Sequence, residues 1–61
     1  MDSKKRILLA DGDDVFRDLL RETLLKEPDF EIVGETGDGE EAVELCRRLS
    51  PDLLVMDLML T

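Results

Sequence analysis

Two aspartates stand at the ends of short apolar runs, where their carboxylates could take part in phosphoryl transfer. Asp11 directly follows residues 7–10 (ILLA), and Asp57 lies inside the apolar run of residues 53–58 (LLVMDL). Carboxylates gathered at one point repel each other unless a cation joins them. Mg²⁺ suits such a place, because it is commonly held by one or two carboxylates together with water and phosphate oxygens. An aspartate beside that ion could attack phosphorus and become an aspartyl phosphate.

The four aspartates of these regions also have structural explanations. Asp13 and Asp14 fit helix caps better than ligands, because Asp is favoured at the N-cap. Asp11 alone is equally consistent with a turn residue and with a ligand. Asp57 is different, because a carboxylate inside a buried apolar strand is costly unless it is paired or functional. We therefore expect Asp57 to be buried within its strand and to have a function.

The apolar pattern predicts the elements that would position these aspartates. Residues 7–10 are typical of a strand buried on both faces, and helical spacing follows them, capped by Asp13 or Asp14 and stopped by Pro28. The predicted order is strand 7–10, helix 15–27, strand 30–34, helix 40–49 and strand 53–58. This β-α-β-α-β order is typical of an α/β fold with a parallel sheet.

Two strand orders satisfy right-handed crossovers, 1-2-3 and 2-1-3. The unbroken apolar run of residues 7–10 favours the order 2-1-3, which places that strand in the centre of the sheet. Glu31 and Glu35 suit an edge position for the second strand. In this order Asp11 and Asp57 extend from neighbouring strands about 4.8 Å apart. Both then lie at the carboxyl edge, at the switch point where open α/β sheets bind ligands.

Two other features are better explained by structure than by chemistry. Gly37-Asp38-Gly39 lacks the Lys and Ser/Thr of a phosphate-binding loop, and we interpret it as a turn and helix start. Cys46 lies on the apolar side of its helix and is expected to be a small core residue.

Composition excludes several classes of function. The chain has 61 residues, of which 43% are hydrophobic and 39% charged, enough apolar content for one small folded domain. Its net charge of −8 disfavours direct binding of nucleic acid or of anionic membranes. The absence of His and the single Cys make zinc and haem sites improbable. Because there is no disulfide pair, signal peptide or transmembrane run, we expect a cytoplasmic protein.

Three blocks together resemble a known family. ILLADGDDVFRDLL, EIVGETGDGEEAVEL and PDLLVMDLML are similar to the first half of a bacterial response-regulator receiver domain, nearest to transcription-regulating members, including the sporulation regulator type. The resemblance covers essentially the whole chain. It implies that residues 1–61 are a truncated receiver, a flavodoxin-like half with strand order 2-1-3. Receivers are among the folds that illustrate the switch-point rule, so that rule does not support the resemblance independently.

The resemblance also implies roles for individual residues. Asp57 matches the phospho-accepting aspartate, Asp11 the first acid of the Mg²⁺-binding pair, and the backbone carbonyl of Met59 a further metal ligand. Gly12 departs from the family, because a second carboxylate that touches the metal usually stands there. Asp13 is the nearest substitute, but it is also expected to begin a helix. Mg²⁺ binding therefore does not follow from the resemblance alone. Thr61, in place of the usual proline, is a milder departure.

The implied function is that of a two-component response regulator. A histidine kinase or phosphotransfer protein would phosphorylate Asp57, and the change would control an output, for which transcription is the first expectation. Beyond this phosphoryl transfer no enzyme activity is expected. The alternatives are a pseudo-receiver that is not phosphorylated and a half-fold whose role is dimerisation.

The resemblance further implies that the chain is a fragment. The family's fourth and fifth strands, which carry the Thr/Ser and the Lys that contact the phosphate, do not occur in these residues. Strand 53–58 would then be an apolar edge, and such edges pair readily with other chains. We expect dimers or higher oligomers that form through this strand or by exchange of elements.

Overall fold

Three parallel strands form the centre of the fold in the computed structural model, which describes residues 4–57. β1 (Lys5–Ala10) lies between β2 (Phe30–Thr36) and β3 (Leu53–Met56), so the strand order is 2-1-3 as predicted. The last four residues of β1 are fully buried. A central strand has neighbours on both edges and both faces, which explains its unbroken apolar run.

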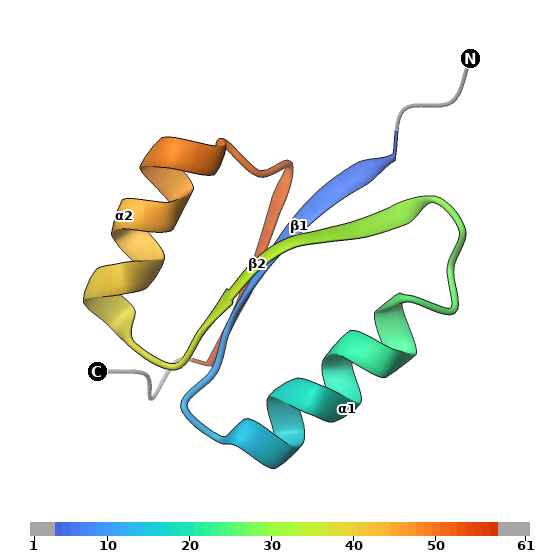
Figure 1. Cartoon of the computed structure of the whole chain (residues 1–61), viewed down its shortest axis with the longest axis horizontal. Helices are drawn as coiled ribbons and strands as arrows, with labels where there is room; N and C mark the ends of the chain where they lie inside the picture. The colour runs from blue at the N-terminus through green and yellow to red at the C-terminus, as the bar shows by residue number, and fades with distance from the viewer. Residues whose placement is uncertain (1–3, 58–61) are drawn as a thin grey trace.

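Two helices cover opposite faces of this sheet (Figure 1). α1 (Asp14–Leu24) is capped by Asp13, whose side chain accepts hydrogen bonds from two amides of the first turn. α2 (Gly39–Leu49) is capped by Asp38, whose side chain accepts a hydrogen bond from the Glu41 amide. Both caps are aspartates because the carboxylate satisfies amides that have no partner within the helix. The capping role expected for Asp13 or Asp14 therefore belongs to Asp13, and Gly37-Asp38-Gly39 is a turn and helix start.

A bulge in β2 sets the pairing of β1 with its neighbour. Ile7 pairs with Ile32, but Leu8 pairs with Gly34, so one extra residue lies between them on β2. Gly34 is also a point of close packing between sheet and helix. A Cβ added there would lie 3.0 Å from Leu8 Cδ1 and 3.1 Å from Leu49 Cδ1. The glycine lets α2 approach the sheet at this point.

The elements differ from the sequence prediction mainly at their ends. β1 begins earlier and β2 continues further, to Thr36, because pairing with the neighbouring strand extends into polar residues. α1 ends at Leu24 rather than continuing to Pro28, and turns connect it to β2.

β3 ends at Met56, so Asp57 follows the strand and does not lie within it. The expectation of a buried Asp57 is wrong, because the residue is exposed. Leu58, also predicted in this strand, lies outside the described residues.

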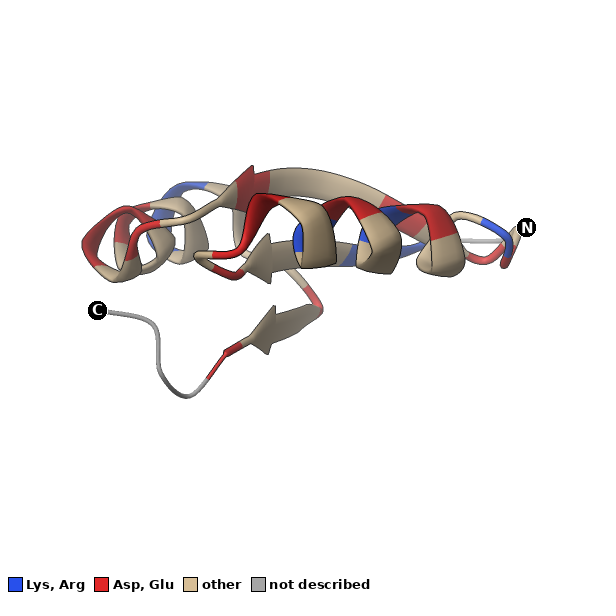
Figure 2. Cartoon of the chain, turned by 90° about the horizontal axis from the view of Figure 1, so that it is seen from below, with Lys and Arg blue, Asp and Glu red and all other residues tan. Residues whose placement is uncertain are grey.

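Much apolar surface on α1 and β3 is exposed. No residue of α1 is buried, and Val15 and Leu19 are 70% and 57% exposed. Leu53, Leu54 and Met56 of β3 are also exposed. Both helices lie beside β1 and β2, whereas β3 projects beyond them (Figure 2). Among residues 4–57, neither helix is long and apolar enough to cross a membrane.

Candidate functional site

Asp11 is fixed in place at the carboxyl end of the central strand. Its residue is only 4% exposed, and its backbone amide donates to the Thr36 carbonyl at 3.0 Å. One carboxylate oxygen, Oδ1, accepts a hydrogen bond from the Asp13 amide at 2.9 Å. A buried carboxylate requires such partners, because an unsatisfied one would be costly. Asp11 is therefore held by the sheet on one side and by the β1–α1 loop on the other.

Asp57 occupies the corresponding place after β3. Its backbone amide donates to the Ala10 carbonyl at 3.0 Å, which continues the ladder between the two strands by one residue. Unlike Asp11, it is exposed to solvent. The ladder positions the backbone of Asp57 while its residue stays accessible to a reactant from outside.

Asp13 and Gly12 complete the loop between β1 and α1. Asp13 Oδ1 accepts hydrogen bonds from the amides of Val15 at 3.0 Å and Phe16 at 3.1 Å. This carboxylate is thus engaged in capping the helix. Gly12 is exposed and adds no carboxylate to the loop. Asp11 and Asp57 are the two acidic residues that directly follow neighbouring strands at this edge of the sheet.

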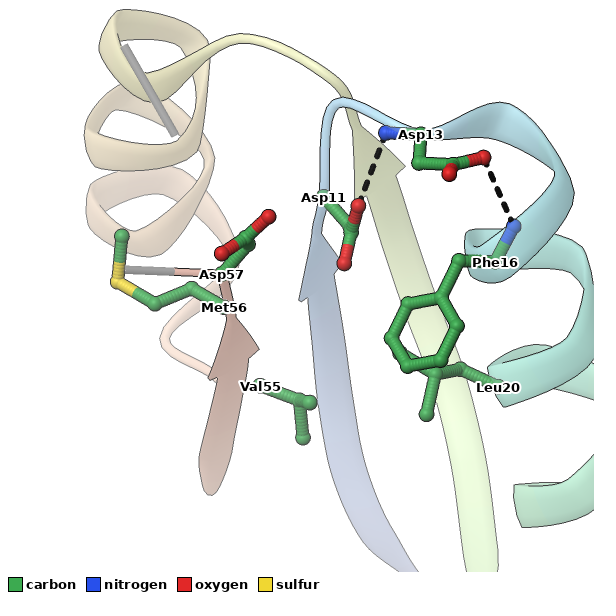
Figure 3. Close-up of a pocket in the computed structure, with 7 residues that line it drawn as sticks. All are labelled: Asp11, Asp13, Phe16, Leu20, Val55, Met56 and Asp57. Atoms are coloured by element: carbon green, nitrogen blue, oxygen red, sulfur yellow. Dashed lines mark hydrogen bonds between the residues drawn. The ribbon is translucent and has the colours of Figure 1, made fainter. Parts of the chain in front are cut away.

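A cleft of about 380 Å³ brings the predicted aspartates together. Asp11 and Asp57 project beyond the ends of neighbouring strands into one opening, with Asp13 at its rim (Figure 3). The opening continues into an apolar part. The full lining consists of Asp11, Asp13, Phe16, Leu20, Val55, Met56 and Asp57. The acidic mouth favours a cation, whereas the apolar part is formed by faces of α1 and β3.

The donor set partly fits a divalent ion. Two carboxylates at the same cleft suit Mg²⁺, which usually keeps several waters and uses only one or two protein carboxylates. Within residues 4–57, however, no group of three or more His, Cys, Asp or Glu is arranged to hold a metal. The expected ligand Met59 and Thr61, which departs from the family's usual proline, lie outside the described residues. The arrangement therefore fits a water-rich, weakly held ion better than a closed metal site.

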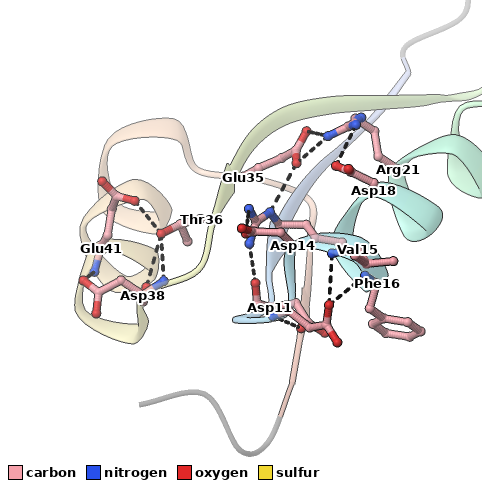
Figure 4. Close-up of polar contacts among 12 residues, drawn as sticks. Asp11, Asp14, Val15, Phe16, Asp18, Arg21, Glu35, Thr36, Asp38 and Glu41 are labelled. Atoms are coloured by element: carbon pink, nitrogen blue, oxygen red, sulfur yellow. Dashed lines mark hydrogen bonds and ion pairs between the residues drawn. The ribbon is translucent and has the colours of Figure 1, made fainter.

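A network of charged residues beside the cleft was not anticipated from the sequence. Arg17 Nη1 donates to the Asp11 carbonyl at 2.5 Å, and its Nε lies 3.5 Å from a Glu35 oxygen. Arg21, one turn further along α1, donates to both Glu35 oxygens at 2.8 Å (Figure 4). Hydrogen bonding to Glu35, with a smaller contribution from Asp18, raises the pKa of Arg21 above its ordinary value. The i, i+4 spacing of the two arginines indicated one helix face, but nothing local indicated Glu35 as their partner.

A second polar cluster stabilises the start of α2. Thr36, a buried residue at the end of β2, has a hydroxyl that contacts the Glu41 carboxylate and accepts a hydrogen bond from the Asp38 amide at 3.0 Å. These contacts join the last residue of β2 to the first turn of α2 (Figure 4). They fasten the short β2–α2 connection to the start of the helix.

Comparison with known families identifies the family of this chain. The model of the response regulator receiver domain matches residues 7–61. The chain belongs to the response regulator receiver family. Receivers are the signalling modules of two-component systems, they generally use Mg²⁺ at the phosphorylation site, and they interact with histidine kinases or phosphotransfer proteins.

Curated relatives of this receiver have diverse outputs. It is 48% identical over 54 residues to the transcriptional regulatory protein PdtaR of Mycobacterium tuberculosis, covering 88% of this chain and 26% of the relative. It is 45% identical over 56 residues to the chemotaxis protein CheY of Halobacterium salinarum, covering 92% of this chain and 45% of the relative. A protein-glutamate methylesterase/protein-glutamine glutaminase of Myxococcus xanthus is 44% identical over 55 residues, and the match covers 90% of this chain and 16% of the relative. The chain thus spans less than half of each of these relatives.

A solved structure supports the same assignment. The signal receiver domain of the putative response regulator NarL from Mycobacterium tuberculosis superposes with a TM-score of 0.92 at 29% sequence identity. The match covers 95% of this receiver chain and 47% of the solved one. The α/β architecture with strand order 2-1-3 is therefore that of a receiver, over the part of the fold that this chain contains.

Proposed function

We propose that this chain is the first half of a phospho-accepting receiver and that Asp57 accepts the phosphoryl group. The observation that carries the proposal is the placement of an exposed Asp57 and a buried Asp11 at one acidic cleft. The exposed carboxylate can meet a phosphodonor, whereas the buried one is fixed as a positioning group.

The proposed reaction is a direct transfer to the carboxylate of Asp57. One oxygen of Asp57 attacks the phosphorus of a phosphohistidine, and the new O–P bond forms as the N–P bond breaks. The electron pair of the broken bond stays with the imidazole nitrogen, which takes a proton from solvent. The hydrogen bond from the Asp57 amide to the Ala10 carbonyl holds the backbone of the nucleophile during this step.

Asp11 and Asp57 are the residues that would hold Mg²⁺ in this chain, with the Met59 carbonyl proposed as a further ligand. Bound at the cleft, Mg²⁺ would neutralise charge on the transferring phosphoryl oxygens. Asp13 is proposed as a helix cap, because its Oδ1 accepts hydrogen bonds from two amides of the first turn of α1. It is not assigned as a ligand, because it stands at the N-cap and does not directly follow a strand at this edge.

Acetyl phosphate provides a test that needs no cognate kinase. The full-length protein is incubated with acetyl phosphate and Mg²⁺, and its intact mass is measured beside that of the Asp57→Asn variant. The expected result is one added phosphoryl group in the wild type and none in the variant. A wild-type protein that gains no phosphoryl group, or an Asp57→Asn variant that gains one as readily, would contradict the proposal.

A second candidate, a pseudo-receiver that binds partners without being phosphorylated, is favoured by one specific observation. Gly12 contributes no carboxylate to the cleft, and the neighbouring Asp13 is committed to the helix. Calorimetric titration with Mg²⁺ separates the two candidates. A phospho-accepting receiver should give a binding isotherm in the millimolar range that weakens in Asp11→Asn, whereas a pseudo-receiver should give no heat.

The partners and output follow from the same proposal. We infer a histidine kinase or phosphotransfer protein as phosphodonor, cytoplasmic action, and an output that most resembles transcriptional control, since PdtaR shares 48% identity with the chain. Direct nucleic-acid binding by residues 1–61 is disfavoured by the net charge of −8. We also infer that the isolated chain self-associates through β3, in which Leu53, Leu54 and Met56 are exposed.

A further inference from the structure

The side chain of Arg17 reaches from the second turn of α1 back to the loop that carries Asp11. Helical side chains point toward the N-terminus of their helix, and this direction brings the guanidinium to the Asp11 carbonyl at 2.5 Å. The Arg17 side chain is only 17% exposed. Asp11 thus has two attachments to the region of α1, one through its carboxylate to the Asp13 amide and one through its carbonyl to Arg17.

The other contacts of the guanidinium fix its orientation. Nη2 of Arg17 lies 2.5 Å from Asp14 Oδ1, and Nε lies 3.5 Å from Glu35 Oε1. The three contacts come from the β1–α1 loop, from α1 itself and from β2. A planar guanidinium presents its donors in a rigid fork, so these contacts together determine where the Asp11 carbonyl is held.

Gly37 provides the space in which this guanidinium lies. A Cβ added at Gly37 would be 3.1 Å from Arg17 Nη1, 3.6 Å from the Asp11 carbonyl oxygen and 3.7 Å from Gly12 Cα. Among the described residues no glycine has positive φ, so backbone conformation does not explain the glycine at this position. The glycine leaves room for the guanidinium over the Asp11–Gly12 peptide, and a methyl group there would crowd it.

We propose that Arg17, seated on Gly37, is a positioning residue that holds the Asp11 carboxylate toward the cleft it shares with Asp57. The peptide that Arg17 holds is followed by Gly12, the residue with the greatest backbone freedom. Without the guanidinium, the turn at Gly12 can move and take the Asp11 carboxylate with it. The inference rests on the proposed function, because it assigns Arg17 to the same Mg²⁺ and phosphoryl site.

The sign of the effect distinguishes positioning from simple electrostatics. Arg17 is a cation beside a proposed cation site, so its charge alone would weaken Mg²⁺ binding and its removal would strengthen it. Positioning has the opposite consequence, because losing a group that orients a ligand typically lowers metal affinity about 10- to 100-fold. A weaker affinity after removal of this positive charge therefore indicates that Arg17 orients Asp11.

Arg21→Met is the matched control for Arg17→Met in the full-length protein. Both variants lose one charge from α1 and one partner of Glu35, but the contacts of Arg21 are with Glu35 and Asp18 and not with Asp11. Mg²⁺ affinity is measured by calorimetry, and exchange of the Asp13 amide, which donates to Asp11, is followed by NMR. We expect Arg17→Met to bind Mg²⁺ about tenfold more weakly and to exchange the Asp13 amide faster. Arg21→Met should change neither.

Two further variants keep the test decisive. Arg17→Lys retains one donor for the Asp11 carbonyl and should recover part of the affinity. Gly37→Ala should weaken Mg²⁺ binding with no change of charge. It replaces Arg17→Met as the test variant if Arg17→Met does not fold. Unchanged or tighter Mg²⁺ binding in Arg17→Met or Gly37→Ala would overturn the role inferred for Arg17. The proposed function would still stand. A wild type that binds no Mg²⁺ and gains no phosphoryl group would overturn the proposed function, and the role of Arg17 with it.

Discussion

The two aspartates at the cleft differ in exposure although they follow neighbouring strands at matching positions. Asp11 is buried because it follows the central strand β1, with β2 and the β1–α1 loop around it. Asp57 is exposed because it follows β3, an edge strand of the described sheet. This difference divides the roles that we propose, with Asp57 as the reactive group and Asp11 as a fixed one.

Asp13 allows capping to be separated from metal binding. We expect Asp13→Ala to lower the free energy of unfolding by about 1 kcal/mol, because two amides of the first turn of α1 lose their acceptor. Asp13→Asn retains an oxygen for capping and should lose little stability. Urea denaturation measures both, and Asp38→Ala at the start of α2 is the matched control for loss of a cap.

Mg²⁺ titration of the same variants tests the second half of this assignment. If Asp13 is a cap only, Asp13→Asn should bind Mg²⁺ as the wild type does. A large loss of affinity in Asp13→Asn, with stability unchanged, would show instead that Asp13 substitutes for the carboxylate missing at Gly12.

At the scale of elements, ion pairs connect α1 to the sheet alongside its partly buried apolar residues. None of its residues is buried, and Val15 and Leu19 face solvent. Glu35 of β2, in contrast, is bound by both Arg17 and Arg21. The position of α1 matters for the site, because its first turns carry Asp13 and Arg17.

Glu35→Gln tests this ionic attachment. We expect the free energy of unfolding to fall by about 1 kcal/mol, at the upper end for partly exposed ion pairs, because one carboxylate serves two arginines. The loss should shrink at high salt, which screens the pairs in the wild type. Glu44→Gln is the control, since it makes the same charge change but interrupts only a 3.9 Å exposed pair with Arg47. Equal losses in the two variants would contradict the attachment.

At the scale of the whole molecule, two opposing properties decide whether chains associate. The apolar residues of β3 favour pairing with another chain. The net charge of −8 opposes it through repulsion. Because salt screens the repulsion and leaves the apolar contact intact, association should increase with ionic strength.

Leu54→Lys tests association through β3. We expect the 61-residue wild-type chain to form dimers or larger species at high micromolar concentration and the variant to remain monomeric in sedimentation velocity. Val43→Lys is the matched control, because it adds the same charge at an exposed apolar residue of α2. A folded wild-type monomer under these conditions would contradict the proposal, as would equal dissociation by both substitutions.

The sequence predicted the local features and missed those that depend on distant contacts. The buried run before Asp11 identified the central strand. The propensity of Asp for the N-cap narrowed the cap of α1 to Asp13 or Asp14, and the structure shows that it is Asp13. The burial of Asp57 was predicted wrongly, because an apolar run does not reveal whether other elements cover the strand. The pairing of Arg17 with the Asp11 carbonyl and with Glu35 was missed, because it forms only when α1 packs beside the sheet.

The most direct test of the central claim is to locate the phosphoryl group on the chain. After incubation of the full-length protein with acetyl phosphate and Mg²⁺, borohydride reduction converts an aspartyl phosphate to homoserine, and peptide mass spectrometry identifies its position. We predict homoserine at residue 57, the exposed carboxylate of the cleft, and unmodified Asp11 and Asp13. Homoserine at residue 11 or 13, or at no residue, would contradict the account.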